Sequence, residues 1–368
     1  MNVNVKVKHG SRIQSFYLFF ILVNIQTGTG IIGAPRYIYE QAKQDGWLSV
    51  IIAGLFVHFV VFMMFLTLKQ YENTDIFGIQ QDLFGKLIGK LLGTIFIIYI
   101  FASLLSVLIN YIQIVQYFIH PILSPWLLSF LLLILVVYSV LGGIRVIVGV
   151  AFVFFVSTLY ILFFLYHPLL EMDLHRFQPF FEASPMELME GARATSYSLL
   201  GLEVVLFIYP FIDDKKKAQL PSQLGVAITA LFLLLVTIIS IGFMGRERLA
   251  DSYWPILIFY KFISYEIIER FDLIVVTAWM MVVLPVMILL TWMMTYGMKR
   301  MYNIRQKKTL FIICFLLFIG GGLMKEQVMI TNYTSYVGQI GFWLTFIYPI
   351  ILYPLVRIKK ALKKEGKN

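Results

Sequence analysis

The chain has 368 residues, of which 60% are hydrophobic and 14% are charged, and its mean hydropathy is +0.84. Soluble domains carry about 25% charged residues, so this composition excludes an ordinary soluble protein and predicts a polytopic membrane protein. The net charge of +10 is also found in nucleic-acid-binding proteins, but here the basic residues cluster between apolar runs, as topology signals do. We therefore expect no nucleic-acid partner.

Apolar runs of membrane length fill the chain almost from end to end, and about 20 residues are needed to cross the hydrocarbon core. They predict an all-α fold of ten transmembrane helices and a single transmembrane domain over residues 1–368. The first run continues to about Ala34, too long for a signal peptide, so we expect it to be retained as a span. The expected spans are 13–34, 47–68, 91–118, 125–141, 146–166, 193–212, 224–244, 272–298, 309–324 and 334–356.

Basic residues predict the orientation of these spans. With the N-terminus inside, most Lys and Arg residues fall in cytoplasmic segments, including Lys215–Lys217, residues 299–308 and a tail that contains Lys364 and Lys367. The positive-inside rule is then satisfied, and an even number of spans places both termini in the cytoplasm. Of two long outer segments, 167–192 is expected to be an ordered or partly ordered loop. The other, 252–270, predicts either a short helix across the outer mouth or a helix on the membrane surface.

A cluster of glycines interrupts the first span. Gly28, Thr29 and Gly30 lie near its middle, where a glycine cluster weakens the helix and each freed backbone group needs another partner. Residues 28–33 match G-x-G-x-x-G, but a dinucleotide site needs a strand before the motif, which a membrane span excludes. We expect an unwound segment whose backbone contacts a ligand, and the alternative is glycine for close helix packing.

The sixth span has a matching interruption. Gly201 lies near its middle together with Glu203, and paired breaks in two halves of a chain indicate a transporter-type binding site. Five spans in each half force opposite orientations, so we expect an inverted repeat of residues 11–167 and 191–357 with broken first and sixth helices. An acid at this depth is functional by default. Glu203 is expected to accept a ligand ammonium group, carry a proton, or hold the break by accepting backbone amides.

For several further residues the alternatives are a packing role and a functional role. Tyr99 lies near mid-membrane and is a candidate to line a central site opposite the two breaks, with simple packing as the alternative. Gly85, Gly89 and Gly93 predict a stripe that another helix approaches closely. His58 is expected to be a hydrogen-bonded packing residue rather than a proton relay.

The chain contains no G-x-S-x-G, no H-E-x-x-H and no Cys/His cluster with metal-ligand spacing. We therefore expect neither an enzyme nor a cofactor.

Four stretches carry a resemblance to a known family. The five-plus-five plan resembles the amino acid–polyamine–organocation transporter superfamily, and more narrowly the chain resembles the B subunits of bacterial spore germinant receptors, the spore permease family. The stretches are TGTGIIGAPRYI (27–38), SLLGLEVVLFIYPFI (198–212), YWPILIFYKFI (253–263) and IERFDLIVVTAWM (268–280).

The resemblance implies a nutrient sensor that binds a small germinant, often an amino acid, in a transporter-like pocket. It implies A and C partner subunits in the inner membrane of the spore. The implied pocket residues are Gly28, Thr29, Gly30, Leu200, Gly201 and Glu203. Two alternatives stay open at this point. One is a proton-coupled amino acid permease that uses Glu203 or His58, and the other is a membrane scaffold for a partner protein.

Overall fold

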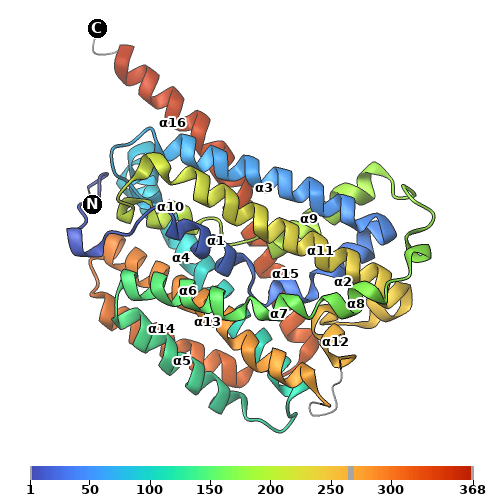
Figure 1. The fold of residues 1–368 in the computed structure, drawn as a ribbon. Coiled ribbons are helices and arrows are strands. Elements are labelled where there is room, and N and C mark those ends of the chain that lie inside the picture. The colour runs from blue at the N-terminus through green and yellow to red at the C-terminus, as the bar shows by residue number, and fades with distance from the viewer. Residues whose placement is uncertain (1, 264–268, 366–368) are drawn as a thin grey trace.

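A computed structural model of the protein describes the backbone of residues 2–263 and 269–365 (Figure 1). Residues 264–268 of the expected outer helix lie outside the described residues, as do Lys367 and the side chain of Lys364. Within the described ranges the chain is helical and forms no strand, and Asn4–Thr74 and Ile13–Ile212 pair as isolated bridges. The all-α prediction is thus confirmed for these ranges.

Most helices in the first half of the chain lie over the predicted spans. They are α1 (Tyr17–Gln26), α2 (Gly30–Ala42), α3 (Gly46–Leu68), α4 (Ile76–Phe118), α5 (Pro125–Leu141), α6 (Ile144–Thr158), α7 (Tyr160–Phe163) and α8 (Tyr166–Leu170). The gap between α1 and α2 falls at the predicted glycine cluster.

The second half begins with α9, whose start is fixed by a capping box between Ser184 and Glu187 and by Pro185 at the first helical position. Its helices are α9 (Pro185–Ser198), α10 (Val204–Ile208), α11 (Gln219–Asp251), α12 (Pro255–Lys261), α13 (Phe271–Tyr302), α14 (Gln306–Leu323), α15 (Gln327–Gly341) and α16 (Tyr348–Glu365), with the π-helical turn η6 (Phe342–Ile347) joining α15 to α16.

Within residues 2–263 and 269–365, seven helical stretches are long and apolar enough to cross a membrane. They are Gly30–Leu68, Ile76–Phe118, Ile144–Leu170, Lys215–Asp251, Phe271–Tyr302, Gln306–Leu323 and Gln327–Lys363. The shorter helices α1 and α5 are also apolar. The protein is therefore a multi-helix membrane protein, and the count of ten crossings stays a prediction.

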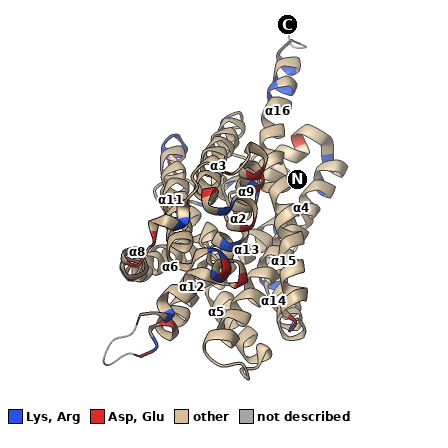
Figure 2. Cartoon of the chain, turned by 90° about the vertical axis from the view of Figure 1, so that its right-hand side faces the viewer, with Lys and Arg blue, Asp and Glu red and all other residues tan. Residues whose placement is uncertain are grey.

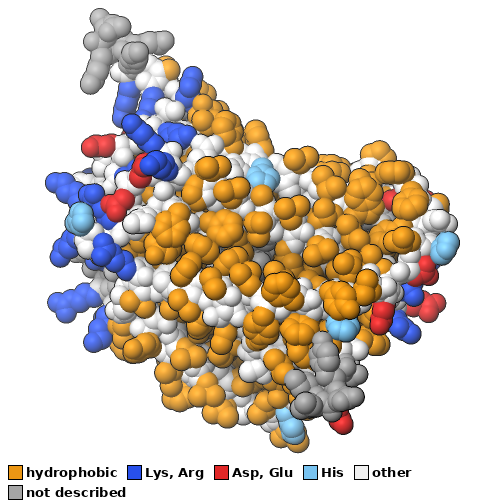
Figure 3. All heavy atoms as spheres, viewed as in Figure 1, with side chains coloured by type: hydrophobic (Ala, Val, Ile, Leu, Met, Phe, Trp, Pro, Cys, Tyr) orange, Lys and Arg blue, Asp and Glu red, His pale blue; other side chains and the backbone are white. Residues whose placement is uncertain are grey.

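Hydrophobic and charged side chains occupy different parts of the surface, as expected for a protein embedded in a membrane. Hydrophobic side chains cover a broad band of the molecule, while Lys and Arg gather at the end that holds the N-terminal segment (Figure 3). We call this the basic end. It includes η5 (Lys215–Lys217), the C-terminus of α13 and the N-terminus of α14. Figure 2 looks at the opposite end, where residues of both charges lie around α2, α9 and α12, and it shows α16 standing out from the bundle and carrying Lys and Arg.

The glycine stripe at the start of the third predicted span is only partly a packing surface. A side-chain Cβ at Gly89 would lie 2.9 Å from Cα of Gln81, and one at Gly93 would lie 2.9 Å from the ring of Phe77. Gly85 differs, because it has φ of +81° and no neighbour within 4 Å of an added Cβ. The packing prediction is therefore wrong for Gly85. This residue reverses the chain so that residues 76–84 fold back onto the helix that follows.

The two segments that are expected on the outer side pack against the bundle in their described parts. The buried side chain of Asp45 accepts hydrogen bonds from the amides of Phe181 at 2.9 Å and Ala183 at 3.0 Å, which holds the loop before α9. The helix α12 packs against α2 and α13 with Leu257 and Phe259 fully buried. The described part of 252–270 is therefore packed on the protein, and a place across the outer mouth stays a prediction.

His58 on α3 matches its expected packing role, because its ring pairs with the side chain of Gln223 on α11. Gln223 donates in return to the His58 carbonyl at 3.2 Å.

A buried acid anchors the N-terminal segment at the basic end. Asp75 is fully buried and caps α4 by accepting the Gly78 amide at 2.8 Å. Its Oδ2 also accepts Tyr296 Oη at 2.5 Å and Arg300 Nε at 2.8 Å. The same guanidinium donates to the Val3 carbonyl at 3.1 Å. One carboxylate thus joins α4, α13 and the extended N-terminal segment.

Replacing this carboxylate tests the anchor. Asp75→Asn keeps the side-chain shape but leaves the guanidinium of Arg300 without its counter-charge, so we expect the free energy of unfolding in detergent to fall by about 3 kcal/mol. Lys217→Gln removes a solvent-exposed ion pair with Asp214 at the same end and should cost less than about 1 kcal/mol. Equal effects of the two substitutions would contradict the anchor.

Candidate functional site

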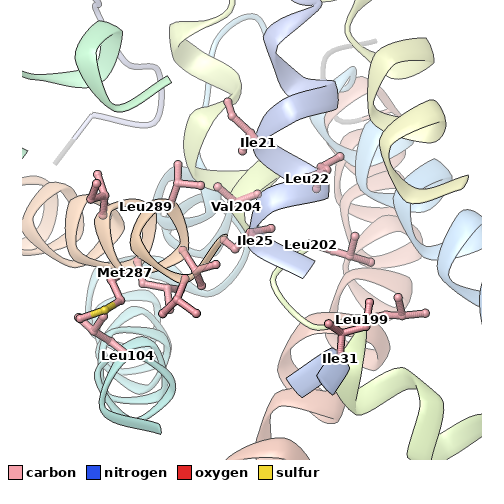
Figure 4. Packing of buried hydrophobic residues seen from close by; sticks show 14 of the residues in the cluster. Ile21, Leu22, Ile25, Ile31, Leu104, Leu199, Leu202, Val204, Met287 and Leu289 are labelled. Carbon is pink, nitrogen blue, oxygen red and sulfur yellow. The ribbon is translucent and has the colours of Figure 1, made fainter. Parts of the chain in front are cut away.

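The two chain breaks lie against each other inside the bundle. The first covers residues 27–29 between α1 and α2, and the second covers residues 199–203 between α9 and α10. Gln26 Nε2 donates to the Leu199 carbonyl at 3.0 Å. Gly201 has φ of +104°, and a Cβ there would lie 2.9 Å from the side chain of Ile25. Figure 4 shows Ile25 of α1 beside the segment that carries Leu202. We call this meeting point the break junction.

The first break leaves polar groups beside open space. Thr27 turns back to its own helix, donating through Oγ1 to the Val23 carbonyl at 2.7 Å. Thr29 is half-buried and Gly30 is exposed, and a Cβ at Gly30 would have only Ser198 Cα nearby, at 3.8 Å. Since α2 begins at Gly30, its first amides lack acceptors within the helix and carry the positive end of its dipole. This is a suitable place for a ligand's negative group.

Gly28 lies differently from Gly30. It is buried, and the nearest atoms to an added Cβ belong to Val286 of α13, at 3.6 Å. The alternative reading of close helix packing therefore describes Gly28 better than Gly30.

Glu203 lies at the start of α10 and is 1% exposed. Its Oε2 accepts a hydrogen bond from Thr345 Oγ1 at 2.8 Å, and Thr345 belongs to the π-helical turn η6. Tyr99 Oη lies 3.5 Å from the same Thr345 hydroxyl. The carboxyl group thus joins the second break to a third irregular segment, which favours the expected role of holding the break, while acceptance of a ligand ammonium group and proton transfer stay predictions.

All seven predicted site residues surround this junction. Tyr99 and Leu200 converge at Gly341, where an added Cβ would lie 2.7 Å from the Tyr99 hydroxyl and 2.9 Å from the side chain of Leu200. Thr345 and Ser198 were missed by the sequence analysis, as was Gly341. A threonine that follows two glycines in the last apolar span, Gly338 and Gly341, is the signal that was available.

Comparison with known proteins shows which family the sequence belongs to. The family described as "Spore germination protein" matches residues 12–328. The chain belongs to this family. It is 30% identical to spore germination protein GerQB of Bacillus cereus over 96% of this chain and 98% of that one. It is 21% identical to spore germination protein A2 of Bacillus subtilis (strain 168), over 95% of this chain and 97% of that one.

A solved structure shows the same fold. It is described as the substrate-bound outward-open state of a Na⁺-coupled sialic acid symporter, with a TM-score of 0.67 and 12% identity. The match covers 93% of this chain and 79% of the symporter. At this identity the likeness concerns the fold alone. It confirms the expected transporter-like fold.

Glycine substitutions separate backbone strain from open space at the break junction. Gly201→Ala forces a side chain into a positive-φ conformation against Ile25, so we expect it to lower the free energy of unfolding by about 2 kcal/mol or more. Gly30→Ala meets neither constraint and should change it by less than about 0.5 kcal/mol. Unfolding of both purified variants in one detergent checks this, and equal stability would contradict the described backbone at Gly201.

Proposed function

We propose that this chain is the membrane subunit of a spore nutrient receptor that binds a small germinant, an amino acid in the first instance, at the break junction. One observation carries the proposal. The breaks of two helices meet at one place, where exposed Gly30 and half-buried Thr29 lie against the segment that carries half-buried Leu200 and the buried acid Glu203. Membership of the spore germination protein family supplies the biological setting.

The chemistry of the junction suits a zwitterion. The first amides of α2 are the natural partners of a ligand carboxylate, because they lie at the positive end of a helix dipole. The ligand ammonium group would be held by carbonyl groups of the second break or by Glu203. Binding favours one packing of the bundle only if the ligand makes better contacts in that packing. The partner subunits would then respond to the change in packing.

The proposal includes the architecture expected from the sequence. The chain would form one membrane domain with ten crossings, in two inverted repeats of residues 11–167 and 191–357. It would lie in the inner membrane of the spore with both termini in the cytoplasm, and it would assemble with A and C subunits. The paired breaks support the repeat, and the basic end supports the orientation.

Gly30→Ala tests the binding site in spores. The added methyl group enters the open space at the junction without disturbing the fold, so we expect the nutrient concentration for half-maximal germination to rise by about tenfold or more. Germination curves for each nutrient are measured together with protein level by immunoblot. Gly149→Ala in α6 is the matched control, since an added Cβ there has no neighbour within 4 Å. Unchanged curves for every nutrient would sink the proposal.

The second candidate is a proton-coupled amino acid permease, which the symporter-like fold favours. It predicts saturable, pH-dependent uptake into vesicles that contain only this chain, and loss of that uptake in Glu203→Gln. The receptor predicts ligand binding without uptake. Glu203→Gln keeps an oxygen that can accept the Thr345 hydroxyl but loses the charge, so it tests the charge itself. We expect no uptake by the unsubstituted chain, and uptake that this substitution abolishes would establish the permease instead.

A further inference from the structure

A cavity of about 870 Å³ lies at the basic end, away from the break junction. The N-terminal segment contributes Lys6 and Lys8 to its lining, the C-terminus of α13 contributes Lys299 and Arg300, and α14 contributes Lys307. We call it the basic cavity. Its volume falls within the range of about 300–1,000 Å³ that is usual for small-molecule sites.

Of the five Lys and Arg residues that line the basic cavity, only Arg300 has an ion-pair partner among the residues that the structure describes. No Asp or Glu is among the residues that line it, and the four lysines form no ion pair with any residue that the structure describes. Of the nearby acids, Asp75 pairs with Arg300 at 2.8 Å, Asp213 with Arg12 at 3.6 Å and Asp214 with Lys217 at 3.4 Å, while Glu72 accepts a hydrogen bond from the Asn4 side chain at 3.3 Å. The helix ends at the cavity offset one another, since α14 and α6 begin there while α13 and α5 end there, so the positive field comes from the lysines. The cavity therefore favours a polyanionic or phosphate-bearing ligand.

One wall of the basic cavity is apolar. Val140 and Leu141 at the end of α5, Ile144 at the start of α6 and Leu310 of α14 line it. Leu141 is 51% exposed, on a helix whose outer side chains belong to the hydrophobic band of the surface. The cavity therefore joins a cationic side to an apolar side at the boundary of that band. A soluble phosphate would contact only the cationic side, whereas a phospholipid would contact both the cationic side and the apolar side.

We infer that the basic cavity binds the phosphate headgroup of an anionic phospholipid of the surrounding leaflet, with the start of its acyl chains along the α5–α6 wall. Basic pockets between helices on the cytoplasmic side suit such headgroups. The phosphate bridges Lys6 and Lys8 of the N-terminal segment to Lys299 and Lys307. It thereby adds a second link to a segment that Asp75 and Arg300 already hold. This inference does not depend on the germinant or on its binding site.

Lipid retention by the full chain tests the inference. The protein is reconstituted in nanodiscs of phosphatidylcholine with phosphatidylglycerol, extracted into detergent, and its retained lipids are quantified by mass spectrometry. We expect phosphatidylglycerol to be enriched over its bulk fraction. Lys299→Gln/Lys307→Gln should bring the retained fraction close to the bulk fraction, because the loss of two charges weakens lipid binding by about 30-fold. Lys299→Arg/Lys307→Arg keeps the charges and should keep the enrichment.

The matched control removes the same charge from the same end outside the cavity. Lys216→Gln/Lys217→Gln, in η5, should leave the enrichment unchanged. Equal losses in both double variants would show a diffuse positive surface and overturn the site, as would retained lipid at the bulk ratio in the unsubstituted chain. Pyrophosphate is added in a third arm. Tight pyrophosphate binding without any preference for phosphatidylglycerol would assign the cavity to a soluble anion and also overturn the inference.

Discussion

Backbone groups within a bilayer have no water to pair with, and the irregular parts of this protein are arranged to meet that constraint. The break in the first half is tied to the break in the second by Gln26 and the Leu199 carbonyl. The second break is tied in turn to the π-helical turn η6 through Glu203 and Thr345. Three interruptions that would each be costly alone therefore stabilise one another. The same arrangement collects polar groups at one depth, where the proposed site lies.

A single helix connects the break junction with the basic end. Val286 of α13 lies against Gly28 in the first break, while Tyr296 and Arg300 of the same helix hold Asp75. The helix also packs along α4, which carries Tyr99. A change in packing at the junction would therefore reach the anchor of the N-terminal segment through one rigid element, without any need for a long chain of intermediate contacts.

Local sequence patterns predicted the parts of the fold that depend on local chemistry. Apolar runs placed the helices, and the clusters at Gly28 and Gly201 placed the breaks, because glycine and membrane depth act within a few residues. Patterns did not separate Gly85 from Gly89, since the same residue type serves a chain reversal in one place and close packing in the other. Nor did they pair Glu203 with Thr345, 142 residues apart. That pairing depends on the register of a distant helix, and spacing within either segment does not contain it.

The register of α16 follows from the π-helical turn that precedes it. A π turn holds more residues than an α turn, and each residue of an α-helix advances by about 100°, so one extra residue rotates everything beyond it by that angle. With the turn in place, Lys359 and Lys363 face Asp82 at 3.7 Å and 3.4 Å. Relaxing it to a regular α-helix would swing those charges away from α4. The irregular segment that holds Glu203 thus also sets which face of the protruding basic helix turns toward α4.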